Sequence, residues 1–244
     1  MSTFINSFWK TAVSFITMSS TSVSASWSPR TITNTSTTLD WTVSNGVTIA
    51  KTTINDPTFD FSGNSGTADI LVENTGGLTH LACNDNSLTA LDVSKGTALT
   101  YLDCGGNSLT ALNVSTNTAL TELECYYNSL TALDVSTNTA LTYLDCGGNS
   151  LTALNVSTNT ALTYLACNDN SLTALDVSTN TVLIYLVCTD NPLTALVTDQ
   201  IFIDLDTNGV IGGTLFIRNN RTSASDTAIA NLITKDWTIT EQEF

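Results

Sequence analysis

The chain has few basic residues. Seven lysines and arginines stand against 22 aspartates and glutamates in 244 residues, which gives a formal net charge of −15 at pH 7. This charge has the wrong sign for binding nucleic-acid phosphates, so we exclude nucleic acid as a partner. The same charge helps to keep a repetitive, β-rich protein soluble.

Sequence motifs of catalysis are also absent. His80 is the only histidine, so any histidine-activated nucleophile would have to lie next to it. Neither a G-x-S-x-G elbow nor a P-loop occurs. The carboxylates that would be needed for a glycosidase pair are Asp103, Glu122, Glu124 and Asp145. We expect them to lie on an open, solvated surface that does not raise their pKa, and we predict a non-enzymatic protein.

Cysteine occurs at six positions only, each 21 residues after the last: Cys83, Cys104, Cys125, Cys146, Cys167 and Cys188. Around each cysteine the pattern L-x-x-L-x-C-x-x-N-x-L-T-A-L recurs, and in the first five coils it continues with x-V-S. The resulting coils begin at Leu78, Leu99, Leu120, Leu141, Leu162 and Leu183, and the second and fourth are identical over all 21 positions. A fixed short period predicts a solenoid, in which each coil stacks only on its neighbours.

This pattern resembles the leucine-rich repeat family, whose consensus is L-x-x-L-x-L-x-x-N/C-x-L. Cysteine replaces the third leucine throughout, as in the short repeats of internalin-like bacterial surface proteins. The resemblance covers about residues 78–198. It implies strands on a concave side and short extended or 3₁₀ structure on the convex side. The alternation of apolar with small or polar residues agrees with one buried side, at Leu81, Cys83, Leu88, Leu91 and Val93.

We interpret the cysteines as core packing. Stacked equivalents point the same way and keep the coil spacing, so disulfides between neighbours would be strained, and a straight row cannot supply a tetrahedral zinc site. One segment, Asp204–Gly209, mimics the start of a calcium loop, but its twelfth position is Leu215 rather than glutamate. We therefore predict no metal and no cofactor.

An asparagine follows each cysteine three positions later. We expect these asparagines to turn inward and to pair with backbone groups of the turns, as a ladder through Asn86, Asn107, Asn128, Asn149, Asn170 and Asn191.

Residues 1–25 carry apolar side chains at spacings of three and four, which predicts an amphipathic helix. Two interpretations compete: a signal peptide ending near Ala25, or a segment for docking or oligomerisation. Lys10 lies within the apolar run rather than before it, which argues against a signal peptide. The run is also too short to span a bilayer. We favour the docking or oligomerisation segment.

Terminal caps are expected at both ends of the solenoid, because open ends expose the core and unpaired strand edges. Residues 26–77 are predicted to form a β-rich cap, whose last strand covers the first coil, from strands at Thr37–Val43, Val47–Ile54, Thr58–Phe61 and Ala68–Glu73. Residues 199–244 are predicted to form an α/β cap. It comprises a helix beginning at Thr198 or Asp199 and ending by Asn208-Gly209, a strand at Gly213–Arg218, a helix at Ser225–Lys235 and a strand at Trp237–Thr240.

Variable residues beside the strands form columns on the concave side. The first column is His80, Tyr101, Glu122, Tyr143, Tyr164 and Tyr185, and the second is Ala82, Asp103, Glu124, Asp145, Ala166 and Val187. In the pair that follows each cysteine, Tyr126-Tyr127 stands at the centre, between glycine pairs that we expect to form shallow notches. The candidate ligand-binding residues are therefore Tyr101, Asp103, Glu122, Glu124, Tyr126, Tyr127, Tyr143, Asp145, Tyr164 and Tyr185.

Three interpretations of this surface stay open. Rings that stack on sugars beside carboxylates that accept hydroxyl hydrogen bonds would bind a glycan. Tyrosine is also enriched in protein recognition surfaces. Alternatively, cross-strand tyrosine stacking only stabilises the sheet.

Two biological settings fit a host-recognition protein of this kind. One is a virion surface or fibre protein of a bacterial virus, docked through residues 1–25. The other is a secreted bacterial cell-surface adhesin that loses this segment. A structural spacer without a ligand is the third class.

Overall fold

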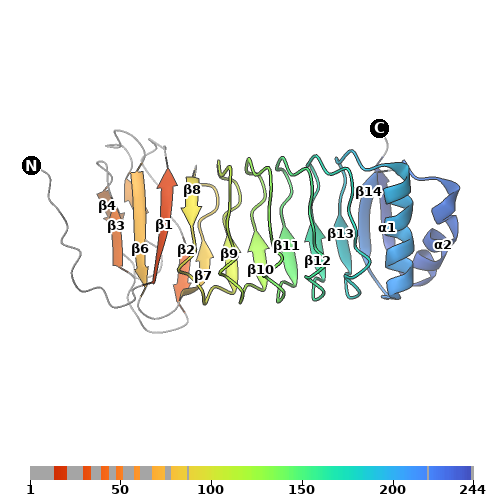
Figure 1. The fold of residues 1–244 in the computed structure, drawn as a ribbon, viewed down its shortest axis with the longest axis horizontal. Coiled ribbons are helices and arrows are strands. Elements are labelled where there is room, and N and C mark those ends of the chain that lie inside the picture. Colours follow the sequence, from red (N-terminus) through yellow and green to blue (C-terminus); the bar gives the residue numbers. More distant parts are fainter. Residues whose placement is uncertain are drawn as a thin grey trace, which may run out of the picture.

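The computed structural model describes strand segments at residues 14–20, 30–33, 40–43, 48–51, 58–60 and 68–74, and then residues 78–242 except Ser87 and Asn219. These residues form one elongated stack, with the N-terminal strands at one end and two helices at the other (Figure 1). The stack between the two ends consists of the 21-residue coils. The predicted repeat solenoid is confirmed.

A nine-stranded sheet runs along one side of the stack (Figure 1). In spatial order its strands are β2 (Arg30–Thr33), β7 (Leu78–Ala82), β9 (Tyr101–Asp103), β10 (Glu122–Glu124), β11 (Tyr143–Asp145), β12 (Tyr164–Ala166), β13 (Tyr185–Val187), β14 (Thr214–Arg218) and β15 (Thr238–Gln242). All neighbours are parallel except β2 and β7. Equivalent positions of successive coils face each other, so Leu123 pairs with Leu102 and Leu144.

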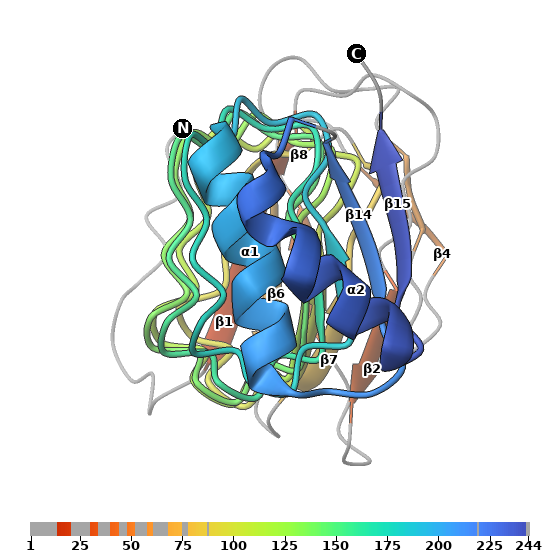
Figure 2. The ribbon, with the colours of Figure 1, turned by 90° about the vertical axis from the view of Figure 1, so that its right-hand side faces the viewer.

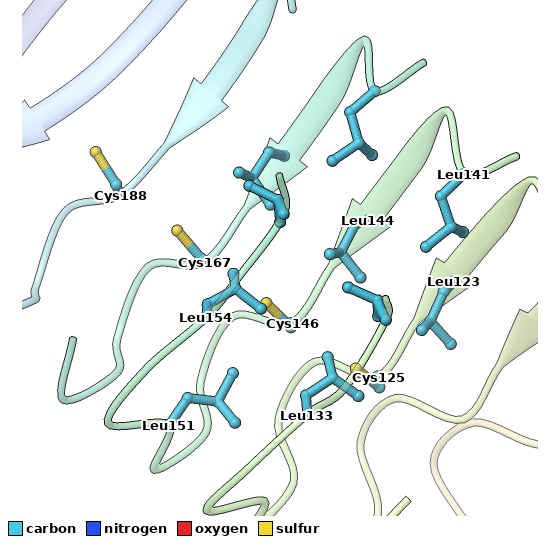
Figure 3. Packing of buried hydrophobic residues seen from close by; sticks show 14 of the residues in the cluster. Leu123, Cys125, Leu133, Leu141, Leu144, Cys146, Leu151, Leu154, Cys167 and Cys188 are labelled. Atoms are coloured by element: carbon cyan, nitrogen blue, oxygen red, sulfur yellow. The ribbon is translucent and has the colours of Figure 1, made fainter. Parts of the chain in front are cut away.

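Rows of leucine, cysteine and valine form the core (Figure 3). In the third coil these residues are Leu123, Cys125, Leu130, Leu133 and Val135, all buried. The residues that alternate with them point outward, as the sequence predicts. Because each coil is too short to enclose a core alone, apolar burial between coils supplies most of the cohesion.

The predicted asparagine ladder is present and joins neighbouring coils. The Nδ2 atom of Asn149 donates to the carbonyl oxygens of Cys125, Cys146 and Gly147 at 3.0, 3.1 and 3.3 Å. Its Oδ1 atom accepts from the Leu130 backbone N–H at 3.0 Å. One amide thereby satisfies backbone groups of two coils. The same arrangement recurs at Asn107, Asn128, Asn170 and Asn191.

A second asparagine ladder, which we did not predict, lies on another edge of the coils. Asn159 donates through Nδ2 to the carbonyls of Val135 and Asn138 at 3.0 and 2.9 Å. The equivalent residues are Asn117, Asn138 and Asn180. The Oδ1 atom of each of the four is buried and has no hydrogen-bond partner within the described residues. In the cap, Asn208 continues the row by donating to the Val177 carbonyl at 3.5 Å.

Two strands cover the first coil, one on each side. On the side opposite the nine-stranded sheet, β1 (Ser14–Ser20) pairs antiparallel with β8 (Leu88–Asp92). On the other side β2 pairs antiparallel with β7. Beyond β1 the sheet continues through β6 (Ala68–Asn74) and β3 (Asp40–Val43), and β4 (Thr48–Lys51) pairs with β5 (Thr58–Asp60).

These strands correct two predictions. The amphipathic helix expected within residues 1–25 is wrong for residues 14–20, which form β1. β6 pairs with β1 over its whole length and β8 pairs with Thr17–Ser20 on the other edge, and the serine, threonine and isoleucine residues of β1 favour helix weakly. The last strand before the repeats, β6, does not cover the first coil, because β1 lies between β6 and β8. The rest of residues 1–25 lies outside the described residues.

The C-terminal cap has the predicted elements. Helix α1 (Ala195–Asn208) and helix α2 (Asp226–Thr234), preceded by the short 3₁₀ helix η1 (Ser223–Ser225), cover the end of the stack (Figure 2). Gly209, with φ 74°, ends α1 as predicted. Neither α-helix of the described part of the chain has the length and apolar character needed to span a lipid bilayer.

The predicted start of α1 is wrong by one turn. Thr194, rather than Thr198 or Asp199, caps the helix, and its hydroxyl accepts from the Val197 N–H at 3.4 Å. Asp199 is buried and accepts instead from the Ser225 hydroxyl at 2.7 Å. The cap thus uses Asp199 to fasten α1 to the start of α2. Asp206, in the calcium-like segment, also joins the two helices, because its carboxylate lies 2.6 Å from the Nζ atom of Lys235.

The asparagine ladder predicts an asymmetry between two asparagines of one coil. Asn149→Ala leaves the Leu130 N–H without a partner and removes three bonds to backbone carbonyls, each of which keeps one other donor, so we expect it to lower the free energy of unfolding by about 1–3 kcal/mol. Asn155→Ala removes only an exposed bond to the Ser157 N–H and should cost about 0.5 kcal/mol or less. Urea unfolding measures both values, and equal losses would show that the ladder does not hold the coils together.

Candidate functional site

The outward-facing residues of β7 and β9–β13, together with the pair that follows each cysteine, form a surface that we call the strand face. It corresponds to the predicted concave side. Strand pairing places Tyr101 beside Glu122, and Glu122 beside Tyr143. Tyr143, Tyr164 and Tyr185 follow on consecutive strands. The structure therefore brings the ten predicted site residues to one continuous surface.

Three tyrosines of the strand face stack on one another. The ring centroids of Tyr143 and Tyr164 lie 4.0 Å apart with an interplanar angle of 9°, and those of Tyr164 and Tyr185 lie 4.5 Å apart at 5°. Phe216 continues the row beyond Tyr185 at 6.0 Å. The two faces of Tyr164 are consequently covered. This row offers a ligand ring edges and hydroxyl groups rather than open aromatic faces.

The central pair of tyrosines lies on glycines of the neighbouring coils. A Cβ atom added to Gly105 would lie 2.5 Å from the Tyr126 ring, and one added to Gly148 would lie 2.3 Å from the Tyr127 ring. The two tyrosine rings contact each other edge to face, with centroids 5.8 Å apart. Tyr126 and Tyr127 therefore fill the notches expected at Gly105 and Gly148, which are not open. The glycines are contact surfaces that only a residue without a side chain can supply.

Tyr127 combines exposure with an unfavourable backbone conformation. Its side chain is 65% exposed and its φ is 46°, in the left-handed region. The equivalent position of other coils has positive φ as well, but it holds Gly or Asp, which tolerate this region better. A tyrosine there costs about 1–2 kcal/mol. Such a cost at an exposed aromatic residue makes Tyr127 a candidate functional residue.

The carboxylates of the strand face are more buried than we expected. Asp103 is 7% exposed, and its Oδ1 accepts from the Gly105 N–H at 3.0 Å. Glu124 accepts from the Tyr101 hydroxyl at 3.0 Å, and Asp145 accepts from the Gly147 N–H at 3.1 Å. Burial raises the pKa of all three carboxyl groups. The expectation of solvated carboxylates is wrong for these three, because tyrosine rings and the loop backbone crowd around them, whereas the fourth, Glu122, is exposed as expected.

A small hollow opens beside the central tyrosines. Its volume is about 250 Å³, and it is lined by Tyr126, Tyr127, Asp145, Gly147 and Asn168. Gly147 belongs to one of the glycine pairs that were expected to form a notch, whereas sequence reasoning missed Asn168 as a lining residue. A larger groove of about 540 Å³ lies on the opposite side between Thr89–Asp92 and Thr110–Ala111, but it has no aromatic side chain.

The cysteines and the histidine are engaged in packing. All six cysteines are buried and free, and burial raises the pKa of each thiol. His80 stacks on Tyr101, with ring centroids 5.9 Å apart, and its Nδ1 lies 2.9 Å from the Thr79 hydroxyl. No group of three or more His, Cys, Asp or Glu side chains in the described residues is arranged to hold a metal ion.

Comparison with known proteins gives structural relatives only. No protein-family model and no curated protein matches the chain. Among solved structures, the functional domain of InlJ from Listeria monocytogenes, which includes a cysteine ladder, is 35% identical, with a TM-score of 0.50 over 68% of this chain and 39% of its own. The internalin InlF of the same species is 24% identical, with a TM-score of 0.53 over 61% of this chain and 44% of its own.

A third match is a leucine-rich-repeat protein of Leptospira interrogans. It is 26% identical, with a TM-score of 0.51 over 52% of this chain and 35% of its own. The chain spans less than half the length of each of these three proteins.

The raised pKa of Glu124 predicts how stability depends on pH. The Glu124 carboxyl group binds its proton more tightly in the folded protein than in the unfolded chain. Its contribution to the free energy of unfolding is therefore greatest below the unfolded pKa and is lost as the pH rises through the folded pKa. Glu124→Gln keeps an acceptor for Tyr101 but removes the titration. We therefore expect the wild-type protein to gain stability from about pH 8 to about pH 4, just below the ordinary glutamate pKa, and the variant to gain less.

Asp134→Asn is the matched control, since it removes one charge on the opposite side of the coil. Hydrogen bonds from Ser136 lower the pKa of Asp134, so its contribution is lost only as the pH falls further. Urea unfolding at the two pH values gives the comparison. An unchanged pH response in Glu124→Gln contradicts the burial argument.

Proposed function

Because the solenoid is an internalin-like leucine-rich repeat, we propose that the chain is a non-enzymatic recognition protein whose strand face binds a protein on the surface of a host cell. The single observation that carries this proposal is the aromatic surface centred on Tyr126 and Tyr127. It lies on a rigid sheet whose register is fixed by parallel pairing. Sites on regular elements hold their geometry better than sites on loops.

The stacking geometry favours a protein ligand over a glycan. Sugar recognition by tyrosine uses the face of the ring, and stacked rings cover both faces of Tyr164 and one face each of Tyr143 and Tyr185. Ring edges and a line of hydroxyls suit the mixed polar and apolar surface of a protein. The exposed ring of Tyr127 adds an anchor at the centre, where residues that dominate binding energy are concentrated in protein interfaces.

The geometry of the polar groups supports a non-enzymatic role. The carboxylates of Asp103, Glu124 and Asp145 each accept a hydrogen bond from the protein itself. They lie on three successive strands along the sheet rather than facing each other across a cleft. The His80 ring stacks on Tyr101, and its Nδ1 lies 2.9 Å from the hydroxyl of the adjacent Thr79.

We place the protein on the virion surface of a bacterial virus. The support is β1, which pairs with both β6 and β8 and so closes the end of the stack. Removal of residues 1–25 as a signal peptide would uncover β8. The other residues of 1–25 would then mediate docking to another virion protein or self-association. The alternative is a secreted bacterial cell-surface adhesin, which the likeness to InlJ favours.

Intact-mass measurement of the native protein separates these settings. The virion proposal predicts that residues 14–20 are retained in the mature protein. A mature protein cleaved near Ala25 contradicts it and favours the secreted adhesin.

The recognition proposal predicts a large binding loss from two substitutions. Tyr126→Ala with Tyr127→Ala removes the central rings, so we expect binding to host cells to fall by at least about tenfold. The probe is the fluorescently labelled full chain on a panel of bacterial cells, treated with protease to remove surface proteins or with periodate to oxidise surface glycans. We expect protease, and not periodate, to abolish binding.

Thr131→Ala with Thr152→Ala, at exposed positions on the opposite side, is the matched control and should bind normally. Urea unfolding of both double variants verifies that the coils remain folded. If the folded double tyrosine variant binds cells normally, the strand face is not the binding site. Sensitivity to periodate alone would replace the protein ligand with a glycan, and no binding to any cell would favour a spacer.

A further inference from the structure

Two coils of identical sequence present different surfaces. The second coil, Leu99–Ala119, and the fourth, Leu141–Ala161, share every residue. After the second coil comes Tyr126, whose ring covers Gly105. After the fourth coil the equivalent residue is Asn168, and the hollow beside Asp145 stays open. Correspondingly, Asp103 is buried whereas Asp145 is partly exposed. The flanking coils therefore decide whether a site exists: Tyr126 and Tyr127 precede the fourth coil and Asn168 follows it.

The walls of this hollow are aromatic on one side and rich in hydrogen-bond acceptors on the other. Tyr126 and Tyr127 supply the two rings, which meet edge to face. The Oδ1 atom of Asp145 accepts from the Gly147 N–H, and the other carboxylate oxygen has no partner among the described residues. Asn168 donates its Nδ2 to Asp169 at 2.8 Å, and its Oδ1 lies over Gly147. Both oxygens are thus available to a donor.

The charge around the hollow is negative and unbalanced. Asp103, Glu122, Glu124 and Asp145 lie on the strand face. Between Leu78 and Phe216 the sequence has a single basic residue, Lys95, which follows Ser94 in a turn next to Asp92. Such a field draws a cation toward the surface and raises its rate of association.

We propose that this hollow binds an arginine or lysine side chain of the protein partner. Its charged end donates hydrogen bonds to Asp145 and to the Asn168 Oδ1, and its stem packs against the rings of Tyr126 and Tyr127. Aromatic rings attract cations, and a basic side chain buries its aliphatic part readily. Arginine fits best, since a planar guanidinium can reach both oxygens at once. This inference rests on the proposed function and specifies the chemistry of the partner.

The direct test is a titration of the ¹⁵N-labelled full chain with three short peptides, followed by amide chemical shifts. The peptides are acetylated and amidated Gly-Ser-X-Ser-Gly, with X as arginine, lysine or glutamine. We expect the arginine and lysine peptides to shift the amide signals of Gly147 and Asn168, and added salt to weaken the effect. Equal shifts with the glutamine peptide, or no shift with any peptide, overturn the proposal.

Variants of the hollow sharpen the test. Asn168→Tyr reproduces the covered arrangement of Gly105, so it should abolish the shift at Gly147 while leaving the urea midpoint close to that of the wild type. Asp145→Asn should also abolish the shift. Asp92→Asn removes the same charge on the opposite side of the coils, so the shift at Gly147 should remain. A shift that survives in folded Asn168→Tyr shows that the peptide binds elsewhere and overturns the proposal.

The cell-binding experiment separates this inference from the proposed function. Loss of cell binding in the double tyrosine variant, with no preference for basic peptides, retains the recognition role and overturns the basic side chain. A preference for basic peptides that Asn168→Tyr removes supports the hollow, even if the protein binds none of the cells tested.

Discussion

Asparagine side chains that reach from one coil to the next impose the constraint on which the other features depend. A coil of 21 residues has too few regular hydrogen bonds to fix its own turns, since its strand in the stack is only three residues long. The amides of Asn107 to Asn191 and of Asn117 to Asn180 pair with turn backbone groups across coil boundaries. Because buried backbone groups must be paired, these bonds specify one register.

The fixed register turns a repetitive sequence into a varied surface. It stacks Tyr143, Tyr164 and Tyr185 so that their faces cover each other. It also lets Tyr126 and Tyr127 lie on glycines of the coils before and after them. The cysteines contribute only volume to the core, while chemical variety is confined to the outward positions beside them. Changes there leave the core untouched, so recognition can vary without loss of the fold.

Local and periodic features were predictable from the sequence, and contacts between distant segments were not. The 21-residue period correctly placed the core and the ladder through Asn149, and the Asn208-Gly209 pair correctly placed the end of α1. The strand β1 was missed because its partners, β6 and β8, lie some 50–70 residues away and give no local signal. The burial of Asp103 and the open hollow at Asp145 depend on Tyr126 and Asn168 of the following coils, so aligned columns alone did not reveal them.

Removal of one whole coil tests the register most directly. Deletion of Leu141–Ala161 joins two coils without changing the phase of either ladder. The account predicts cooperative urea unfolding and five remaining cysteines that stay protected from a thiol reagent in the native protein. Deletion of Leu141–Thr160, one residue shorter, should disrupt the stack and expose thiols. Equal thiol protection in the two deletion variants would contradict the account, because it would show that the ladders do not set the register.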